Sequence, residues 1–130
     1  MIKLGELELP KGMVWEGELN WTPVQSETER TLGGRLVVWE DQVSGGRPVD
    51  LVAYENQGWL TREQVKALRQ MASEPGATYT LLYGPDGEEQ SLIVRFRHED
   101  PPVLEVEPLL PRSNAQDGDY YYGRIKLVEV

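Results

Sequence analysis

The chain has 130 residues, of which 39% are hydrophobic and 27% charged, with a net charge of -9 and a pI near 4.6. This length fits one domain with one hydrophobic core and leaves little room for a second, ligand-binding domain. The acidic balance argues against binding to nucleic-acid backbones or anionic membranes. The absence of cysteine excludes disulfides, thiolate metal sites and a thiol nucleophile.

No segment approaches the ~18 consecutive apolar residues of a membrane-spanning helix. The first residues, Met1-Ile2-Lys3-Leu4-Gly5-Glu6, lack the three regions of a signal peptide. We therefore expect a single domain over residues 1–130 that starts in the cytoplasm and does not enter a membrane.

The N-terminal third contains short predicted strands and one unusual polar segment. Residues 7–10 and 13–15 are predicted to form a short hairpin, and residues 36–39 and 49–54 to form strands. Residues 20–34 are polar, end in Gly33-Gly34 and resemble neither strand nor helix. A long polar segment in a compact domain is typical of either a functional arm or a solvated loop. We place partner contacts there.

One helix is predicted over residues 61–73. Thr61 and Gln64 have the spacing of a capping box, in which each side chain bonds to the backbone of the other residue. The apolar residues that follow share one helix face: Val65, Leu68, Met71 and Ala72. Pro75-Gly76 ends the helix.

The remainder of the chain is rich in strand signals. Residues 78–83 and 91–97 are predicted to pair as a hairpin around the turn Gly84-Pro85-Asp86-Gly87. Residues 103–107 and 120–130 alternate between apolar and polar residues, which indicates strands with one buried face. Residues 109–119 contain proline, asparagine and glycine, and we expect a loop there that, like residues 20–34, makes partner contacts.

Seven or eight strands with one helix favour a mainly β fold. Alternating crossover helices are missing, which argues against a parallel doubly wound sheet. The prediction is a β-sandwich or a partly open β-barrel with one α-helix packed on its side.

The sequence offers no convincing catalytic, metal or cofactor site, and we expect that the protein is not an enzyme. His98 stands beside Glu99 and Asp100, but neighbouring residues of an extended chain point in opposite directions. The glycine pairs 33–34 and 45–46 lack the spacing of a phosphate-binding loop. The many carboxylates of so acidic a chain carry little information about paired acid and base groups.

The aromatic residues fall into two groups. Trp15, Trp39 and Trp59 lie in apolar patterns and are predicted to pack in the core. Trp21 and the run 120–122 border polar segments, where tyrosine and tryptophan are typical of interfaces. The predicted interface residues are Trp21, Gln25, Glu27, Glu29, Arg30, Leu32, Tyr120, Tyr121 and Tyr122.

Several short phrases spread over most of the chain are distinctive, and none of them is a catalytic motif: Leu9-Pro10, Val14-Trp15, Trp21-Thr22-Pro23-Val24, Glu29-Arg30-Thr31-Leu32-Gly33-Gly34, Gly46-Arg47-Pro48, Trp59-Leu60-Thr61-Arg62, Phe96-Arg97-His98 and Ile125-Lys126-Leu127-Val128-Glu129-Val130. Through these phrases the chain resembles small tail-tip proteins of tailed bacteriophages and prophages.

Within that group the chain is similar to distal-tail or tail-tube-adaptor proteins, whose β-barrel-plus-helix domain forms rings around the DNA channel. It is too short for the peripheral domain that a distal tail protein commonly adds. The resemblance implies a structural virion protein that forms a ring, a hexamer or a trimer, and joins the tail tube protein to baseplate or other tail-tip proteins. It implies a place in the tail after synthesis in the host cytoplasm, with DNA passing through the lumen and no sequence-specific contact to nucleic acid.

Two alternatives come from other classes of protein. A carbohydrate-binding or adhesion module would need exposed, coplanar tryptophan and tyrosine rings. A transient tail-assembly factor would be missing from finished particles.

Overall fold

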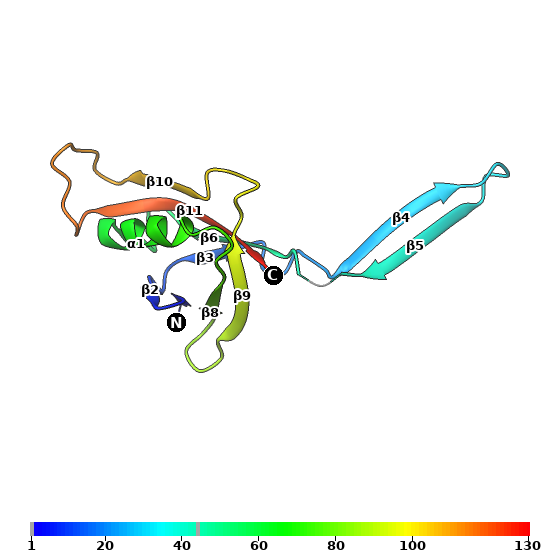
Figure 1. The fold of residues 1–130 in the computed structure, drawn as a ribbon, viewed down its shortest axis with the longest axis horizontal. Helices are drawn as coiled ribbons and strands as arrows, with labels where there is room; N and C mark the ends of the chain where they lie inside the picture. The colour runs from blue at the N-terminus through cyan, green and yellow to red at the C-terminus, as the bar shows by residue number, and fades with distance from the viewer. Residues whose placement is uncertain (1, 44) are drawn as a thin grey trace.

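The structure is a computed structural model that describes residues 2–43 and 45–130. In these residues it contains one helix and two antiparallel sheets (Figure 1). The elements in chain order are β1 (Ile2–Leu4), β2 (Leu7–Leu9), β3 (Val14–Glu16), β4 (Val24–Arg30), β5 (Leu36–Gln42), β6 (Pro48–Ala53), β7 (Leu60–Thr61), α1 (Arg62–Ala72), β8 (Tyr79–Tyr83), β9 (Gln90–Phe96), β10 (Leu104–Pro108) and β11 (Tyr120–Glu129).

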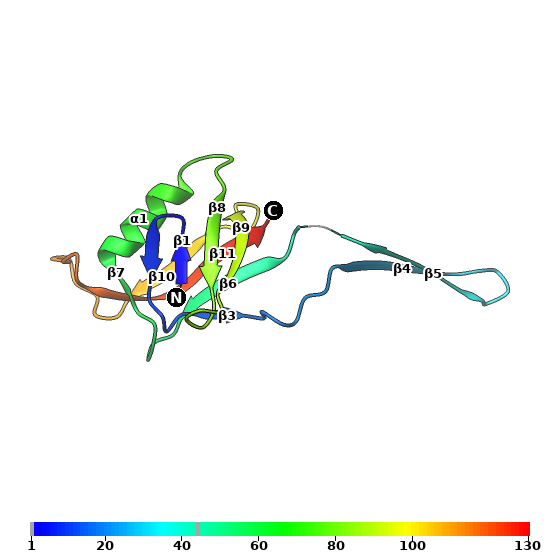
Figure 2. The ribbon, with the colours of Figure 1, turned by 90° about the horizontal axis from the view of Figure 1, so that it is seen from below.

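The larger sheet is organised around the long strand β11. Its main path has the order β2-β1-β8-β9-β11-β6-β3. Strand β10 also pairs with β11, and β7 pairs with the first residues of β11. The described strands do not close into a barrel, and the helix lies against the sheet (Figure 2). The predicted fold class, mainly β and sandwich-like with one side helix, is confirmed.

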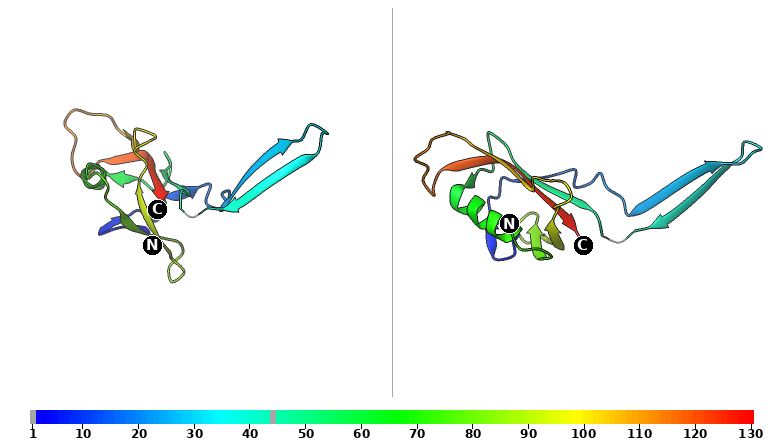
Figure 3. Two further views of the ribbon diagram at one scale, coloured as in Figure 1. Left: turned by 45° about the vertical axis from the view of Figure 1, so that its right-hand side comes forward. Right: turned by 45° about the horizontal axis from the view of Figure 1, so that its top comes forward.

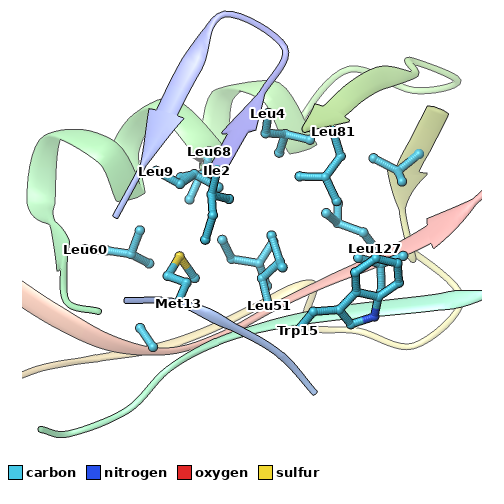
Figure 4. Packing of buried hydrophobic residues seen from close by; sticks show 14 of the residues in the cluster. Ile2, Leu4, Leu9, Met13, Trp15, Leu51, Leu60, Leu68, Leu81 and Leu127 are labelled. Atoms are coloured by element: carbon cyan, nitrogen blue, oxygen red, sulfur yellow. The ribbon is translucent and has the colours of Figure 1, made fainter. Parts of the chain in front are cut away.

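The core lies on the face of the sheet that also contacts the helix. On β11 Ile125 and Leu127 belong to this core, and Arg124 and Lys126 lie on the other face, as the sequence pattern predicts. Lys126 is nevertheless buried, at 7% exposure, so this part of the strand is covered on both faces. Figure 4 shows side chains from β1, β3, β6, β8, β11 and α1 meeting in this cluster. Trp15 is 3% exposed and packs edge-on against Tyr83 with ring centroids 5.6 Å apart, so its prediction as a core residue is confirmed.

The helix begins and ends where the sequence predicts. Thr61 caps it: the Thr61 hydroxyl accepts a hydrogen bond from the backbone of Gln64, and the Gln64 side chain accepts one from the backbone of Thr61. Leu68 is fully buried, and the other residues of the predicted apolar stripe pack against the core cluster. Burial of this face, more than helix propensity, stabilises an 11-residue helix in water.

The opposite face of the sheet carries ion pairs. The Nη2 atom of Arg97 lies 2.9 Å from Oδ1 of Asp50, and the Nζ atom of Lys126 lies 2.6 Å from Oε1 of Glu105. The hydrogen bond to Glu105 is the main reason that the pKa of Lys126 is raised. These pairs let charged side chains cover a sheet face that no helix covers in the described residues.

The first residues are arranged differently from the sequence prediction. We expected residues 7–10 and 13–15 to pair as a hairpin, and this is wrong. Strand β2 pairs instead with β1, which the sequence analysis missed, and β3 pairs with β6. The partners of β3 lie more than thirty residues along the chain. Local alternation therefore identifies these strands but not their neighbours.

Candidate functional site: the projecting β4–β5 hairpin

Strands β4 and β5 form a hairpin that extends away from the rest of the molecule (Figures 1 and 3). They pair in register from Val24 opposite Gln42 to Arg30 opposite Leu36. The turn is closed by a hydrogen bond from the Thr31 amide to the Arg35 carbonyl at 2.8 Å. Gly34 supplies the positive φ, +83°, that this turn requires.

This hairpin replaces the irregular arm that we expected over residues 20–34. Residues 24–30 are a strand, and Gly33-Gly34 belong to the turn of a longer unit that includes residues 36–42. The sequence pattern did not indicate a strand because neither side of β4 is buried. Every residue of β4 is exposed, so no apolar and polar alternation develops along it.

The two sides of the hairpin differ in chemistry. Residues directly opposite each other in an antiparallel pair lie on the same face. We define the valine face by Val24, Thr28, Leu36 and Val38. We define the tryptophan face by Gln25, Glu27, Glu29, Val37 and Trp39.

Trp39 corrects a prediction. It is 53% exposed on the hairpin, so the expectation that it packs in the core is wrong. The apolar run that contains it continues into a strand with no sheet or helix behind it (Figure 2). The same expectation is wrong for Trp59, which is 36% exposed and donates a hydrogen bond from its indole nitrogen to the carbonyl of Glu55.

The hairpin has open strand edges and exposed apolar side chains. Within the described residues, β4 and β5 form a two-stranded sheet with no third strand, so each strand has an open edge. Val24, Leu36 and Val38 are about half exposed on the valine face. An isolated two-stranded hairpin is marginally stable in water, and open edges pair readily with other strands. The hairpin therefore offers open strand edges and exposed apolar side chains for contact with another surface.

Five of the predicted interface residues lie on this hairpin. Gln25, Glu27 and Glu29 are on the tryptophan face, Arg30 is at the end of β4, and Leu32 is fully exposed in the turn. Trp21, a sixth, precedes the hairpin at its base and is partly buried. Three apolar residues of the hairpin, Leu36, Val38 and Trp39, were not among the predicted interface residues. Their spacing beyond the glycine pair was the available signal for a hairpin partner strand.

The three predicted tyrosines lie far from the hairpin tip, on β11 beside the helix (Figure 1). Tyr120 is half exposed and contacts Trp59, with ring centroids 5.3 Å apart and planes tilted by 41°. The hydroxyl of Tyr121 accepts a hydrogen bond from Arg62, and that of Tyr122 donates one to Glu107. The structure does not bring these tyrosines together with the other predicted interface residues.

The segment 109–119 is held against the start of the helix. Lys66 on α1 pairs with Asp117 at 2.8 Å, and the amide of Arg62 donates to the carbonyl of Asp119. Arg112 pairs with the Asp119 carboxylate across the loop. These hydrogen bonds from Lys66 and Arg112 lower the pKa of Asp117 and Asp119. The loop is therefore anchored to the helix through the Asp117 carboxylate and the Asp119 carbonyl, while the ion pair between Arg112 and Asp119 braces the loop internally.

Residues 97–100 do not assemble a site around the histidine. Glu99 pairs with Arg95 at 2.9 Å, and Asp100 pairs with Arg97 at 3.4 Å. The ring of His98 lies near that of Phe96. Among residues 2–43 and 45–130, no cluster of three side chains suited to bind a metal was found. No helix in that part of the chain is both long enough and apolar enough to span a bilayer.

The chain matches no protein-family model, no curated protein and no solved structure. The hairpin is consequently the candidate site on physical grounds alone.

Proposed function

We propose that this chain is a structural subunit of a phage tail tip, which forms a ring around the DNA channel and joins the tail tube to baseplate or tip proteins. The observation that carries the proposal is the β4–β5 hairpin, with Trp39 and the valine face exposed on a projecting two-stranded sheet. Such a surface suits assembly with other subunits and makes or breaks no covalent bond.

The hairpin lacks a hydrophobic core of its own. Burying one large apolar side chain contributes about 1.5–3 kcal/mol, and a lone hairpin has no core in which to gain it. A neighbouring subunit would supply that burial, and its strands would pair with the open edges of β4 or β5. Contact with the neighbouring subunit would then stabilise the hairpin.

The location in a phage tail rests on the resemblance of the sequence phrases to tail-tip proteins. The net charge of -9 is compatible with it, because an acidic wall repels the DNA that slides past. The sandwich-like fold with one side helix is compatible with ring-forming subunits. The ring order that we propose is six or three.

The carbohydrate-binding alternative has one supporting observation, the partly exposed pair Trp59 and Tyr120. The rings are tilted by 41°, whereas stacking on a sugar would use coplanar rings. We therefore prefer assembly. A binding screen against glycans, with Trp59→Ala as the control variant, separates the two functions.

The test compares the full chain with a variant in which residues 24–42 are replaced by a short glycine turn. The replacement is feasible because the amide of Val43 already bonds to the carbonyl of Pro23 at 3.0 Å. Light scattering over a range of concentrations should give a discrete closed oligomer for the full chain and a folded monomer for the variant. An oligomer that survives loss of the hairpin, or a full chain that stays monomeric, contradicts the proposal.

A second measurement distinguishes a virion component from a transient assembly factor. Mass spectrometry of purified tail particles should find the chain in stoichiometric amounts. Its absence from particles, together with hairpin-dependent self-association, would favour the assembly factor.

A further inference from the structure

The hairpin turn presents an apolar residue flanked by two cations. Leu32 is fully exposed, and Arg30 and Arg35 stand on either side of it in the chain. Arg30 donates a hydrogen bond to the carbonyl of Gly34, which holds its side chain over the turn. Within the part of the chain that the structure describes, neither arginine has a carboxylate partner.

A groove of matching character lies between the β1–β2 turn and the helix. It has a volume of about 650 Å³ and is lined by apolar side chains that include Leu7, Ala67 and Met71. The carboxylates of Glu6 and Glu74 also line it. Neither of them pairs with a cation among residues 2–43 and 45–130. The groove thus combines an apolar lining with two unpaired negative charges.

A second groove on the other side of the helix has the opposite charge. It is lined by Val65, Val103 and Leu104, and its charged group is Arg69. A turn that carries two arginines would meet repulsion there and attraction in the groove between Glu6 and Glu74. The two arginines of the turn therefore favour the groove lined by Glu6 and Glu74 over the groove lined by Arg69.

The turn cannot occupy the groove of its own chain. The tip of the β4–β5 hairpin and the helix lie at opposite ends of the molecule in two perpendicular views (Figures 1 and 2). An occupant with this chemistry must come from another molecule.

We propose that the hairpin turn of one copy of this chain docks into the Glu6–Glu74 groove of a second copy, with Leu32 against Ala67 and Met71. The proposal rests on the assembly function above and names its contact. Such a contact joins two different surfaces head to tail, and repeating it generates a ring where the rotation closes and a filament where it does not.

The absence of native cysteine allows a direct test by disulfide trapping. Full-length Leu32→Cys protein is mixed with full-length Ala67→Cys protein of distinguishable mass and oxidised mildly. The control pairs Leu32→Cys with Leu110→Cys, a site that is equally apolar and well exposed but outside the groove. We expect a mixed disulfide dimer from the first pair at about ten times the yield of the control or more.

Charge reversal is the second part of the test. Adding Arg30→Glu and Arg35→Glu to the Leu32→Cys protein should reduce the yield to that of the control, since like charges would then meet in the groove. Adding Glu6→Arg and Glu74→Arg to the Ala67→Cys protein should restore it. Equal yields from groove and control pairs, or a yield indifferent to charge reversal, overturn the proposal.

The results distinguish failure of the proposed assembly function from failure of the proposed contact between the turn and the groove. Hairpin-dependent oligomers without trapping between positions 32 and 67 would retain the assembly function and reject this contact. Monomers at every concentration, with trapping at the control level, would reject both.

Discussion

Glu27 and Trp39 lie directly opposite each other across the β4–β5 ladder, so a carboxylate stands beside the largest exposed ring of the hairpin. Cross-strand neighbours of this kind have Cβ atoms about 5 Å apart. The Glu27 carboxylate keeps the tryptophan face hydrated, and a charged side chain on an open strand disfavours pairing with unrelated strands. A partner surface that covers the tryptophan face would therefore have to accommodate a ring and a carboxylate together.

Replacing this ring should weaken assembly without unfolding the body. We expect Trp39→Ser to reduce self-association at least about tenfold, because the variant loses the apolar area that a partner would bury. Light scattering measures the effect. Ile93→Ser is the matched control, since Ile93 is equally exposed on β9 of the body. Similar losses from both variants would show that general surface polarity, and not the hairpin, controls association.

The glycine at position 123 should be irreplaceable for a steric reason. A Cβ atom there would clash with the carbonyl oxygen of Glu105, and the φ of +146° at this position disfavours other residues. We expect Gly123→Ala to lower the free energy of unfolding by at least about 2 kcal/mol. Urea denaturation measures it. Gly118→Ala, where the added atom meets nothing within 4 Å, should change stability by less than about 0.5 kcal/mol.

The helix should depend on one buried leucine. Leu68 is fully buried, and Leu68→Ala is expected to cost about 2–5 kcal/mol through lost burial and the cavity that remains. Leu110→Ala, on the exposed loop, should be nearly neutral. A thermal unfolding series gives both values. A neutral Leu68→Ala would mean that the helix does not stabilise the sheet.

Acid should weaken the ion pair that braces the loop at residues 109–119. Hydrogen bonding to Arg112 lowers the pKa of Asp119 below its ordinary value of 3.8. The unfolded chain therefore binds this proton more readily, so the stabilisation is present above pH 3.8 and is lost as pH falls through the lower pKa of the folded state.

We expect Arg112→Gln to be less stable than the parent at neutral pH and the difference to shrink in acid. Urea unfolding at several pH values measures this difference, and NMR titration of the Asp119 carboxyl gives the direct readout. A stability difference that does not change with pH would assign the role of Arg112 to packing.

The body of this fold was predictable where one face of a strand supplies the core, as on β9 and on the core side of β11. Alternation on β9 and β11, and the capping box of α1, are local signals that the packing reinforces. The pairing of β3 with β6 was not predictable, since it joins distant segments whose local pattern is the same as that of a hairpin. The strand β4 was missed because it has no buried side, and the core placement of Trp39 failed for the same reason.

The β4–β5 ladder is joined to the body at one end only, so its length is independent of the core. Adding two residues to each strand would lengthen the hairpin by about 7 Å and keep every side chain on its face. Adding one residue to each strand would turn the outer residues, including those of the turn, to the other side. The reach of the hairpin from the body could therefore change over evolution in discrete steps of two residues per strand, without any change to the packed interior.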